Sequence, residues 1–413
     1  MRVSGPVDPL SVDLDAVDLV DPRTYAHGDP HPVWHALRAR DPVRWHPVGS
    51  GGFWSVTTYD DASYVLRDHT AFTSERGTLL SLLGKDDPAG GRQMAATDPP
   101  RHTRMRAPLQ RALTIKAVER STGLIAEQVR RLLAPARSGE PFDLAEALTQ
   151  LPMAVAGMLM GLPQEDWPRL TRLTLMAIAA DDPEYMSQET PEATVELAHR
   201  ELFAYFAEIV RLRRRTPGDD LISLLMTTAV DGEPLGPGEV LSNCYSLLLG
   251  ANVTTPYVPL AAFDSLLGTP ALEDLLRPRS VADALEEALR WASPANHFMR
   301  HARHDVELGA VKIRAGDAVV VWLGSANRDE KVFADPYTFD ARRKPNRHMA
   351  FGSGAHYCVG HTVARVSLRT LLTELGSGFS DFERAGETEH LSSNFVAGIK
   401  HLVVTAKVRK PGD

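Results

Sequence analysis

One loop constrains this chain more than any other stretch. Residues 351–360 read Phe-Gly-Ser-Gly-Ala-His-Tyr-Cys-Val-Gly, and a helix-like segment follows at residues 362–375. Glycine has no Cβ, so such a loop can lie flat against a bulky planar group. A cysteine at a helix start has its thiolate favoured by the helix dipole and by the free N–H groups. The loop is therefore expected to present the thiolate of Cys358 to a ligand.

A thiolate with no second cysteine nearby suits axial ligation of haem iron. A lone cysteine is often just a small buried hydrophobe, which fits Cys244 in the apolar run 244–249 better than Cys358 among glycines. A zinc site from His356, Cys358 and His361 would need a fourth ligand, and no CxxC pair accompanies them. Covalently attached c-type haem would need a CxxCH motif, which is absent.

The loop resembles the FGxGxHxCxG haem-binding signature of the cytochrome P450 family, and other segments resemble that family in the same order over nearly the whole chain. The resemblance implies a mainly α fold with small β-sheets, a triangular α-rich prism that holds haem b between a distal and a proximal helix. It also implies a single P450 domain over residues 1–413. Cys358 would be the metal ligand, and Phe351, Gly352 and Gly360 would lie against the cofactor.

The patterning of the chain agrees with this class of fold. Turn-forming glycines between β-type residues predict β-rich patches near residues 43–57, 305–323 and 395–408. Helical periodicity dominates from about residue 101 to residue 289. No low-complexity linker or repeat marks a domain boundary.

Glu287 and Arg290 form an ExxR pair. At this spacing on a helix the two side chains share a face and can pair. Taken alone, such a pair usually lies on the solvent-exposed face of a helix. In the family that this chain resembles, the pair is buried and interacts with an arginine later in the sequence, which corresponds here to Arg343. Its implied role is structural, since a bidentate arginine network would fix the loop that carries the cysteine.

His102 and Arg106 stand one helical turn apart. Haem carries two propionates, which cationic or N–H donors on one helix face can bind. By the family resemblance, these two residues with Arg300 and His356 would be the propionate contacts. The alternative is a basic, solvent-facing helix start.

Residues 240–267 are predicted to form the helix over the distal face of the haem, and they are apolar on most sides. The family pattern there is small-small-x-acid-Thr. This chain keeps Gly250, Ala251 and Thr254 but has Val253 at the acid. Ala251, Asn252 and Thr254 are the catalytic candidates. Because valine relays no proton, protons would come through water held by Asn252 and Thr254, or through the substrate.

Pro256 interrupts the same helix. A proline removes its own N–H bond and crowds the carbonyl four residues back, which is that of Asn252. This carbonyl could hold a water beside Thr254. A kink without a chemical role is the equally open alternative.

The family resemblance also implies a substrate cavity that is mostly apolar with a few polar points. Such a lining suits a mid-sized organic molecule with a few hydrogen-bonding groups. Asn296, His297 and Asn394 would be the polar points, unless the first two satisfy loop backbone instead. The predicted substrate contacts are Leu80, Leu83, Leu247, Gly250, Asn296, His297, Phe298 and Phe395.

The expected function is that of a haem-thiolate monooxygenase that inserts one oxygen atom from O2 into a substrate C–H bond. Electrons would come from NAD(P)H through ferredoxin and ferredoxin reductase, since the chain has no Rossmann or flavin fingerprint. Abundant Ala, Arg, Gly and Pro hint at a high-GC bacterium and at secondary metabolism such as antibiotic biosynthesis. Alternatives are epoxidation, multi-step oxidation, oxidative coupling, peroxide-driven oxidation, a haem sensor, or a zinc hydrolase.

Charge and hydropathy indicate the kinds of partner. A net charge of −8 disfavours nucleic acid. A basic cluster of Arg104, Arg111, Arg342, Lys344 and Arg347 would suit docking of an acidic ferredoxin. The acidic N-terminal segment has no apolar core of a signal peptide, and the apolar run at 152–163 is too short to span a bilayer. A cytoplasmic protein without a membrane partner is expected.

Overall fold

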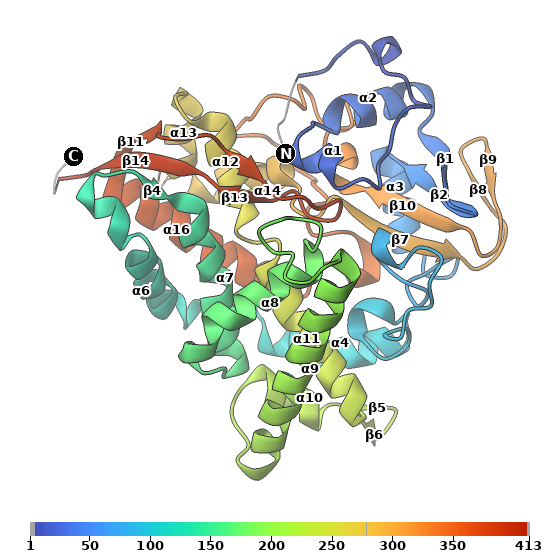
Figure 1. Cartoon of the computed structure of the whole chain (residues 1–413), viewed down its shortest axis with the longest axis horizontal. Helices are drawn as coiled ribbons and strands as arrows, with labels where there is room; N and C mark the ends of the chain where they lie inside the picture. Colours follow the sequence, from blue (N-terminus) through green and yellow to red (C-terminus); the bar gives the residue numbers. More distant parts are fainter. Residues whose placement is uncertain (1–4, 278, 411–413) are drawn as a thin grey trace.

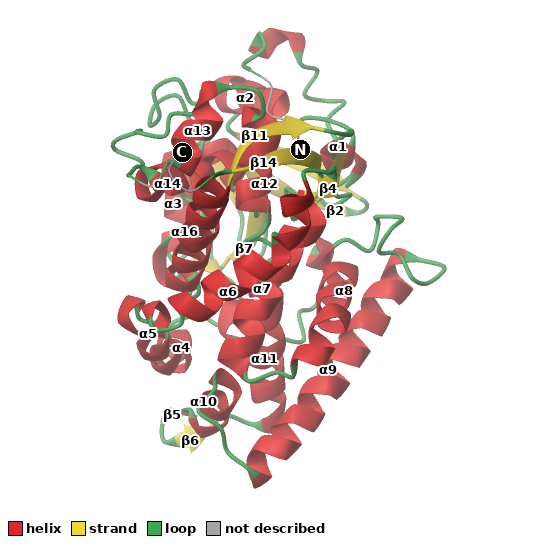
Figure 2. Ribbon diagram, turned by 90° about the vertical axis from the view of Figure 1, so that its left-hand side faces the viewer, coloured by secondary structure: helices red, strands yellow, loops and turns green. Residues whose placement is uncertain are grey.

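A computed structural model describes residues 5–277 and 279–410 of the chain. Helices dominate, and the larger sheets lie together in the upper part of Figure 2. The predicted class, mainly α with small sheets, is confirmed. The single-domain assignment over residues 1–413 stays a prediction. None of the described helices is both long and apolar enough to cross a membrane.

The α-helices of the described residues are α1 (Arg23–Ala26), α2 (His31–Arg40), α3 (Tyr59–Arg67), α4 (Arg101–Ala112), α5 (Ile115–Glu119), α6 (Thr122–Leu132), α7 (Leu144–Met160), α8 (Trp167–Ile178), α9 (Pro191–Arg215), α10 (Leu221–Thr227), α11 (Pro237–Asn252), α12 (Tyr257–Leu266), α13 (Pro270–Leu276), α14 (Val281–Ala292), α15 (Leu323–Ala326) and α16 (His361–Gly378). The strands are β1 (Val43–Val48), β2 (Gly51–Val56), β3 (Phe72–Thr73), β4 (Phe142–Asp143), β5 (Ala229–Val230), β6 (Glu233–Pro234), β7 (His297–Ala302), β8 (Val306–Leu308), β9 (Val311–Ile313), β10 (Ala318–Trp322), β11 (Phe379–Arg384), β12 (Glu389–His390), β13 (Ile399–His401) and β14 (Val403–Val408).

The main sheet has the strand order β1-β2-β10-β7-β3, in which β10 runs parallel to β2 and the other pairs are antiparallel. Strand β10 reads Ala-Val-Val-Val-Trp and is buried at all five positions, as the central strand of a covered sheet requires. Its neighbour β7 is fixed in register by this pairing, with Arg300 opposite Val319. The sheet thereby places Arg300 in the group of cationic and histidine side chains described below.

Four helices form the centre of the helical part. The largest apolar cluster joins side chains of α7, α12, α14 and α16. Helix α7 is buried on most of its sides because nearly all of its residues are apolar, and the Asp143 carboxylate caps it by accepting the N–H of Ala145 at 2.9 Å. Helix α11 packs against α7 and α9 and runs through the middle of the molecule (Figure 1).

The prediction of one continuous helix over residues 240–267 is wrong. Helix α11 ends at Asn252, and α12 begins at Tyr257 after Pro256 as its N-cap. Pro256 has no N–H, and the N–H groups of Tyr257 and Val258 donate three residues back, to Thr254 O and Thr255 O. The carbonyls of Asn252 and Val253 therefore lose the donors that an unbroken helix would supply.

Candidate functional site

The predicted cysteine loop closes on itself just before α16. Cys358 follows a short 3-10 helix (Gly354–His356), and its N–H donates to Phe351 O at 2.9 Å. The N–H groups of Gly360 and His361 face the sulfur. The N-terminus of α16 and the loop together present one sulfur atom, as the sequence predicts.

Burial raises the pKa of the Cys358 thiol, whereas the loop N–H groups, Arg106 and Arg365 act in the opposite direction. A metal cation bound to the sulfur would favour the thiolate strongly. The zinc alternative finds no ligand set, because the described residues hold no group of three or more His, Cys, Asp or Glu side chains suited to a metal.

Glycine is found at positions 354 and 360 of the loop for two different structural reasons. Gly354 has a φ of +73°, and a Cβ there would lie 2.8 Å from Leu66 O and from Arg67 Cα in α3. Gly354 therefore admits the approach of α3, a requirement that the sequence did not reveal. A Cβ at Gly360 would meet only Cys358 Sγ, at 3.9 Å. That side of the loop has room beside the sulfur for a flat ligand.

The four predicted propionate contacts come together from three parts of the chain. His102 and Arg106 lie on α4, Arg300 on β7 and His356 in the loop. The rings of His102 and His356 are 4.3 Å apart. Both ring nitrogens of His102 and Nε of Arg106 are buried and have no hydrogen-bond partner among the described residues.

The positive charges of Arg106 and Arg300 in this group favour binding of an anion. Burial, then Arg300, His102 and Arg106, lower the pKa of His356 to about 2, and burial lowers the pKa of Arg300 to about 10. The nearby Asp98 carboxylate is already used by Arg303 and Thr73. Two carboxylates would satisfy the orphaned donors. Together with the sulfur and the open side of the loop, the donor set fits the iron and the two propionates of a haem.

Ser74 also belongs to this group, although the sequence did not predict it as a site residue. Its Oγ lies 3.2 Å from Nε2 of His356, and its N–H donates to Asp98 Oδ1 at 3.0 Å. Ser74 thus orients the His356 ring from the side of β3. No pattern in the sequence links residues so far apart in the chain.

Glu287, Arg290 and Arg343 form one buried network. Arg290 donates two hydrogen bonds to Glu287, at 2.7 and 2.8 Å. Arg343 Nε lies 3.1 Å from both carboxylate oxygens. The backbone N–H of Asp340 and the side chain of Asn346 also donate to Glu287. The network fixes the segment that leads into the cysteine loop.

A second carboxylate network holds the loop itself. Glu286 accepts hydrogen bonds from Arg365 at 2.7 and 2.8 Å and pairs with His348 at 3.0 Å. Burial would raise the pKa of Glu286, but Arg365 and His348 hold it at about 2. The Arg365 guanidinium lies 4.5 Å from the ring centroid of Phe351. This support of Phe351 was not predicted, although Glu286 adjoins the ExxR motif.

Thr254 and Gly250 lie together at the end of α11. The Thr254 hydroxyl donates to Gly250 O at 3.3 Å. Gly250 is exposed, and a Cβ built there would meet nothing within 4 Å. Leu247 and Ala251, partly buried, border the same apolar cluster as Val359 beside Cys358. Gly250 therefore borders open space at the end of α11, with Thr254 bonded to it.

Asn252 lies away from Gly250, and the Oδ1 atom of its side chain is buried without a hydrogen-bond partner among the described residues, so its predicted role as a water-holding residue stays a prediction. Its side-chain Nδ2 lies 3.4 Å from Met153 Sδ and 3.5 Å from Thr174 Oγ1, and the residue is 4% exposed. The rotation of α11 turns Asn252 between α7 and α8, away from the open space at Gly250. Val253 is 2% exposed in the main apolar cluster.

Asn296 and His297 are both 0% exposed, and Oδ1 of Asn296 has no hydrogen-bond partner among the described residues. Nδ2 of Asn296 donates to Asn394 O at 3.1 Å. His297 accepts the Leu80 N–H at Nε2 and therefore donates from Nδ1 to Asn394 O, at 3.1 and 3.2 Å. Both residues satisfy loop backbone, which is the alternative left open by the sequence.

Of the remaining predicted substrate contacts, Leu80 is buried, and Leu83, Phe298 and Phe395 are partly exposed. The ring centroids of Phe298 and Phe395 are 6.0 Å apart. The partly exposed members are thus apolar, and the two polar members are fully buried.

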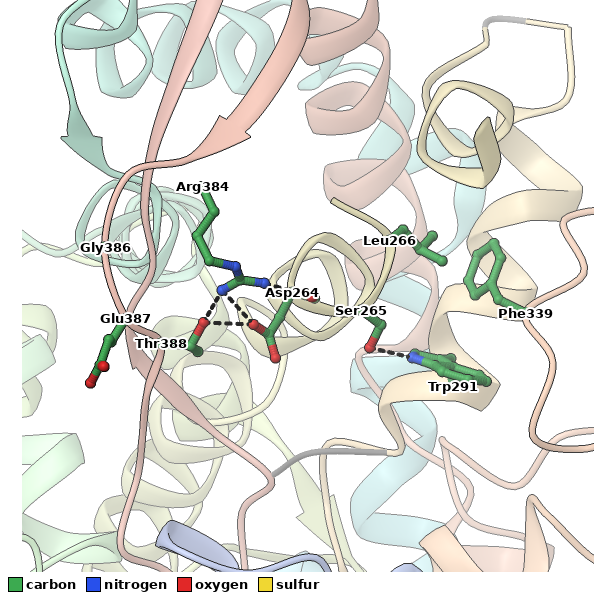
Figure 3. A pocket seen from close by; sticks show the side chains of 9 residues that line it. All are labelled: Asp264, Ser265, Leu266, Trp291, Phe339, Arg384, Gly386, Glu387 and Thr388. Carbon is green, nitrogen blue, oxygen red and sulfur yellow. Dashed lines mark hydrogen bonds and ion pairs between the residues drawn. The ribbon is translucent and has the colours of Figure 1, made fainter. Parts of the chain in front are cut away.

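A surface cleft of about 700 Å³ lies away from these residues. Figure 3 shows Arg384, Asp264 and Thr388 joined across it, and the Trp291 indole bonded to Ser265. None of the residues predicted for haem or substrate lines this cleft, and its polar groups are largely paired with one another.

Two of the basic residues predicted for docking are engaged in ion pairs. Arg104 pairs with Asp231 of the β5–β6 hairpin, and Lys344 Nζ lies 2.7 Å from Asp283. Arg111 is exposed in the last turn of α4. Both paired residues remain exposed at the surface, and docking of an acidic ferredoxin on this cluster stays a prediction.

Known proteins resemble this chain both locally and over its length. A family model described as "Cytochrome P450" matches residues 264–395. The protein "Cytochrome P450 NovI" of Streptomyces niveus is 33% identical over 398 residues, covering 95% of this chain and 97% of that protein.

Two solved structures share the fold. The crystal structure of P450 OxyD, described as involved in the biosynthesis of vancomycin-type antibiotics, has a TM-score of 0.85 and 35% identity, covering 95% of this chain and 100% of that one. The Mycobacterium marinum cytochrome P450 CYP268A2 in complex with pseudoionone has a TM-score of 0.87 and 31% identity, covering 95% and 98% of the two chains.

Proposed function

The chain belongs to the cytochrome P450 family, oxidoreductases that use O2 and a haem-iron cofactor, and we propose that it is a haem b monooxygenase acting on a mid-sized organic substrate. One oxygen atom would enter a substrate C–H bond as hydroxyl and the other would leave as water, at the expense of two electrons and two protons. The observation that carries this proposal is the single sulfur of Cys358 beside four converging cationic or N–H donors.

When bound, the haem supplies the oxygen-activating iron chemistry. Cys358 would hold the iron, and His102, Arg106, Arg300 and His356 would hold the propionates. The networks around Glu286 and Glu287 keep the loop in place, so that the sulfur does not shift when the cofactor binds.

Thr254 is the residue proposed to move protons. Its hydroxyl already donates to Gly250 O and can accept a hydrogen bond from water in return. The carbonyls of Asn252 and Val253, which lack their helical donors, can accept further water hydrogen bonds between α11 and α12. This backbone would serve in place of the missing acid, whereas the Asn252 side chain is directed elsewhere.

A second candidate is peroxide-driven oxidation of the same kind of substrate. Val253 favours it, because peroxide brings its own protons and electrons and does not depend on an acidic relay. Turnover with reductase partners compared with turnover with hydrogen peroxide separates the two candidates.

Ferredoxin and ferredoxin reductase are the proposed electron donors, and a cytoplasmic location belongs to the same proposal. The relatives NovI and OxyD support a role in secondary metabolism, since OxyD is described as involved in antibiotic biosynthesis. The complex of CYP268A2 with pseudoionone supports a terpenoid-like substrate as well.

The test is the optical spectrum of the reduced carbon monoxide adduct of purified holoprotein. The red-shifted band diagnostic of sulfur coordination is expected for the natural chain and not for Cys358→His. A natural chain that binds haem without that band would overturn the proposal.

A further inference from the structure

Arg328 is a fully buried cation in the turn after α15, and it is 0% exposed. Its Nη2 donates to Trp291 O at 2.6 Å, and the guanidinium lies 5.0 Å from the centroid of the Trp291 ring. Its Nε and Nη1 have no hydrogen-bond partner among the described residues. Two nitrogens of a buried charge therefore lack an acceptor in this part of the chain.

Two side chains of α2 lie near this cation with their own donors unpaired. His31 and Trp34 are both 0% exposed, and their ring centroids are 5.0 Å apart. Burial, followed by the charge of Arg328, lowers the pKa of His31 well below its ordinary value, so the ring is neutral and carries one N–H. Over the residues that the structure describes, both ring nitrogens of His31 and Nε1 of Trp34 have no partner. We call His31, Trp34 and Arg328 the donor cluster.

The carboxylates close to the donor cluster are committed to other arginines. Glu287 binds both Arg290 and Arg343. Glu330 accepts a hydrogen bond from Arg38 at 2.8 Å. Positive charge therefore exceeds negative charge in this region of the fold.

The charge of Arg328 is only partly compensated by its surroundings. Burial, then Arg290, lower the pKa of Arg328 to about 9, although Tyr337 and Asp29 act in the opposite direction. Asp29 Oδ1 is engaged by the backbone N–H of His31 at 2.9 Å. An uncompensated buried charge is more costly than an unpaired neutral donor, so the donor cluster favours a negatively charged acceptor.

A small anion satisfies the donor cluster better than a water molecule does. Buried polar groups in native proteins are bonded to protein, to ordered water or to an ion. Water can accept N–H hydrogen bonds but does not neutralise the guanidinium, whereas an anion does both. Because all three side chains are fully buried, a ligand among them must itself be small.

We infer that the donor cluster of His31, Trp34 and Arg328 is an internal binding site for a small inorganic anion of the halide class. The bound anion would accept N–H hydrogen bonds from the guanidinium, the imidazole and the indole, and would thereby tie α2 to the turn after α15. The inference goes beyond the proposed function, because none of these residues is assigned to haem or substrate.

Thermal unfolding of the purified holoprotein tests the site in solution. Sodium chloride and sodium bromide are compared with sodium gluconate at one ionic strength, since gluconate is too large to enter. Either halide is expected to raise the Tm by at least about 2 °C, because an anion that binds only the folded state stabilises it. Equal Tm values in the three salts would overturn the inference.

Variants assign the effect to the donor cluster. Arg328→Met is expected to abolish the halide shift. Trp34→Phe keeps the shape of the ring and removes one N–H, so the chloride concentration at half-maximal shift should rise at least about fivefold, and this variant decides the matter where Arg328→Met does not fold.

Trp322→Phe is the matched control for Trp34→Phe. Trp322 is equally buried and its ring lies 5.7 Å from that of Trp34, but its indole already donates to Ser55 Oγ at 2.6 Å. Its halide shift should equal that of the natural chain. A shift that is unchanged in Trp34→Phe, or lost equally in Trp322→Phe, would contradict the site.

Bromide can also be located directly. Crystals of the holoprotein grown in sodium bromide should give an anomalous scattering peak at hydrogen-bonding distance from Arg328 and from the ring of His31. The same peak should be absent from crystals of Trp34→Phe or reduced in them. Electron density at the donor cluster without an anomalous signal would identify water instead and overturn the inference.

Discussion

Glu287 and Arg290 form an ion pair from which water is excluded. Arg290 Nη2 lies 2.7 Å from Glu287 Oε1, and both side chains are 0% exposed. Arg290 also donates to the carbonyls of Asn327 and Pro336, at 2.9 Å each. The pair therefore ties α14 to the chain segments that lead into the cysteine loop.

Glu287→Ala is expected to destabilise the fold strongly. It leaves Arg290 and Arg343 without their carboxylate, and removing one partner of a buried ion pair typically costs about 3–5 kcal/mol. Chemical denaturation of the purified protein measures the loss. A second expected effect is poor haem retention, because the segment before the loop loses its anchor.

Glu208→Ala is the matched control for Glu287→Ala. Glu208 pairs with Arg211 at the same i,i+3 spacing, but on the exposed side of α9. No measurable change is expected there, since exposed pairs contribute little. Similar losses in the two variants would contradict the buried role of Glu287.

His401 links three segments of the chain and makes stability depend on pH. Its Nδ1 lies 2.6 Å from Asp143 Oδ2, and its Nε2 lies 3.0 Å from Glu184 Oε2. The hydrogen bond with Asp143, followed by that with Glu184, raises the pKa of His401 against the effect of burial. Only the protonated ring can donate to both carboxylates at once.

Because the folded pKa is raised, the stabilisation by His401 is complete below its unfolded pKa of about 6.5 and is lost as pH rises through the folded pKa. The stability difference between the natural chain and His401→Gln should therefore be largest at acidic pH and shrink toward alkaline pH. Thermal unfolding across that range measures it. His304→Gln, at an exposed histidine, is the control, and a difference that grows with pH would refute the linkage.

Thr254→Val should uncouple electron use from product formation. Valine keeps the shape of threonine but removes the hydroxyl that bonds to Gly250 O. Since a positioned proton donor typically contributes about 10²–10⁴-fold, product per NAD(P)H should fall at least about tenfold, with more hydrogen peroxide released. Thr255→Val is the control, and unchanged coupling in Thr254→Val would exclude this hydroxyl from the proton route.

Arg111→Glu should slow reduction by an acidic ferredoxin at low salt by roughly tenfold, and the effect should fade as salt screens the charges. Arg104→Glu should have a smaller effect, because Arg104 already pairs with Asp231. Stopped-flow reduction at several salt concentrations measures both. Arg214→Glu, on the basic last turn of α9, is the control. Equal slowing by Arg214→Glu would point to net charge rather than to a docking site.

The thiolate loop was predictable because its signals are local. Cys358, its flanking glycines and the following helix lie within one short stretch, so spacing alone indicates their chemistry. The pairing of Glu287 with Arg290 is local in the same sense. The grouping of His102, Arg106, Arg300 and His356 came from the family resemblance, and the structure brings the four together.

The sequence by itself determined the haem-binding chemistry and the mainly helical class, since each follows from residue type and short-range spacing. Whether Pro256 kinks one helix or separates two was decided by the tertiary structure. Only the tertiary structure decided which side chains face the site. The rotation of α11 turned Asn252 toward α7, and the register of β7 put His297 under the sheet and Phe298 beside Arg300. These orientations depend on packing between segments distant in the chain, which no local pattern records.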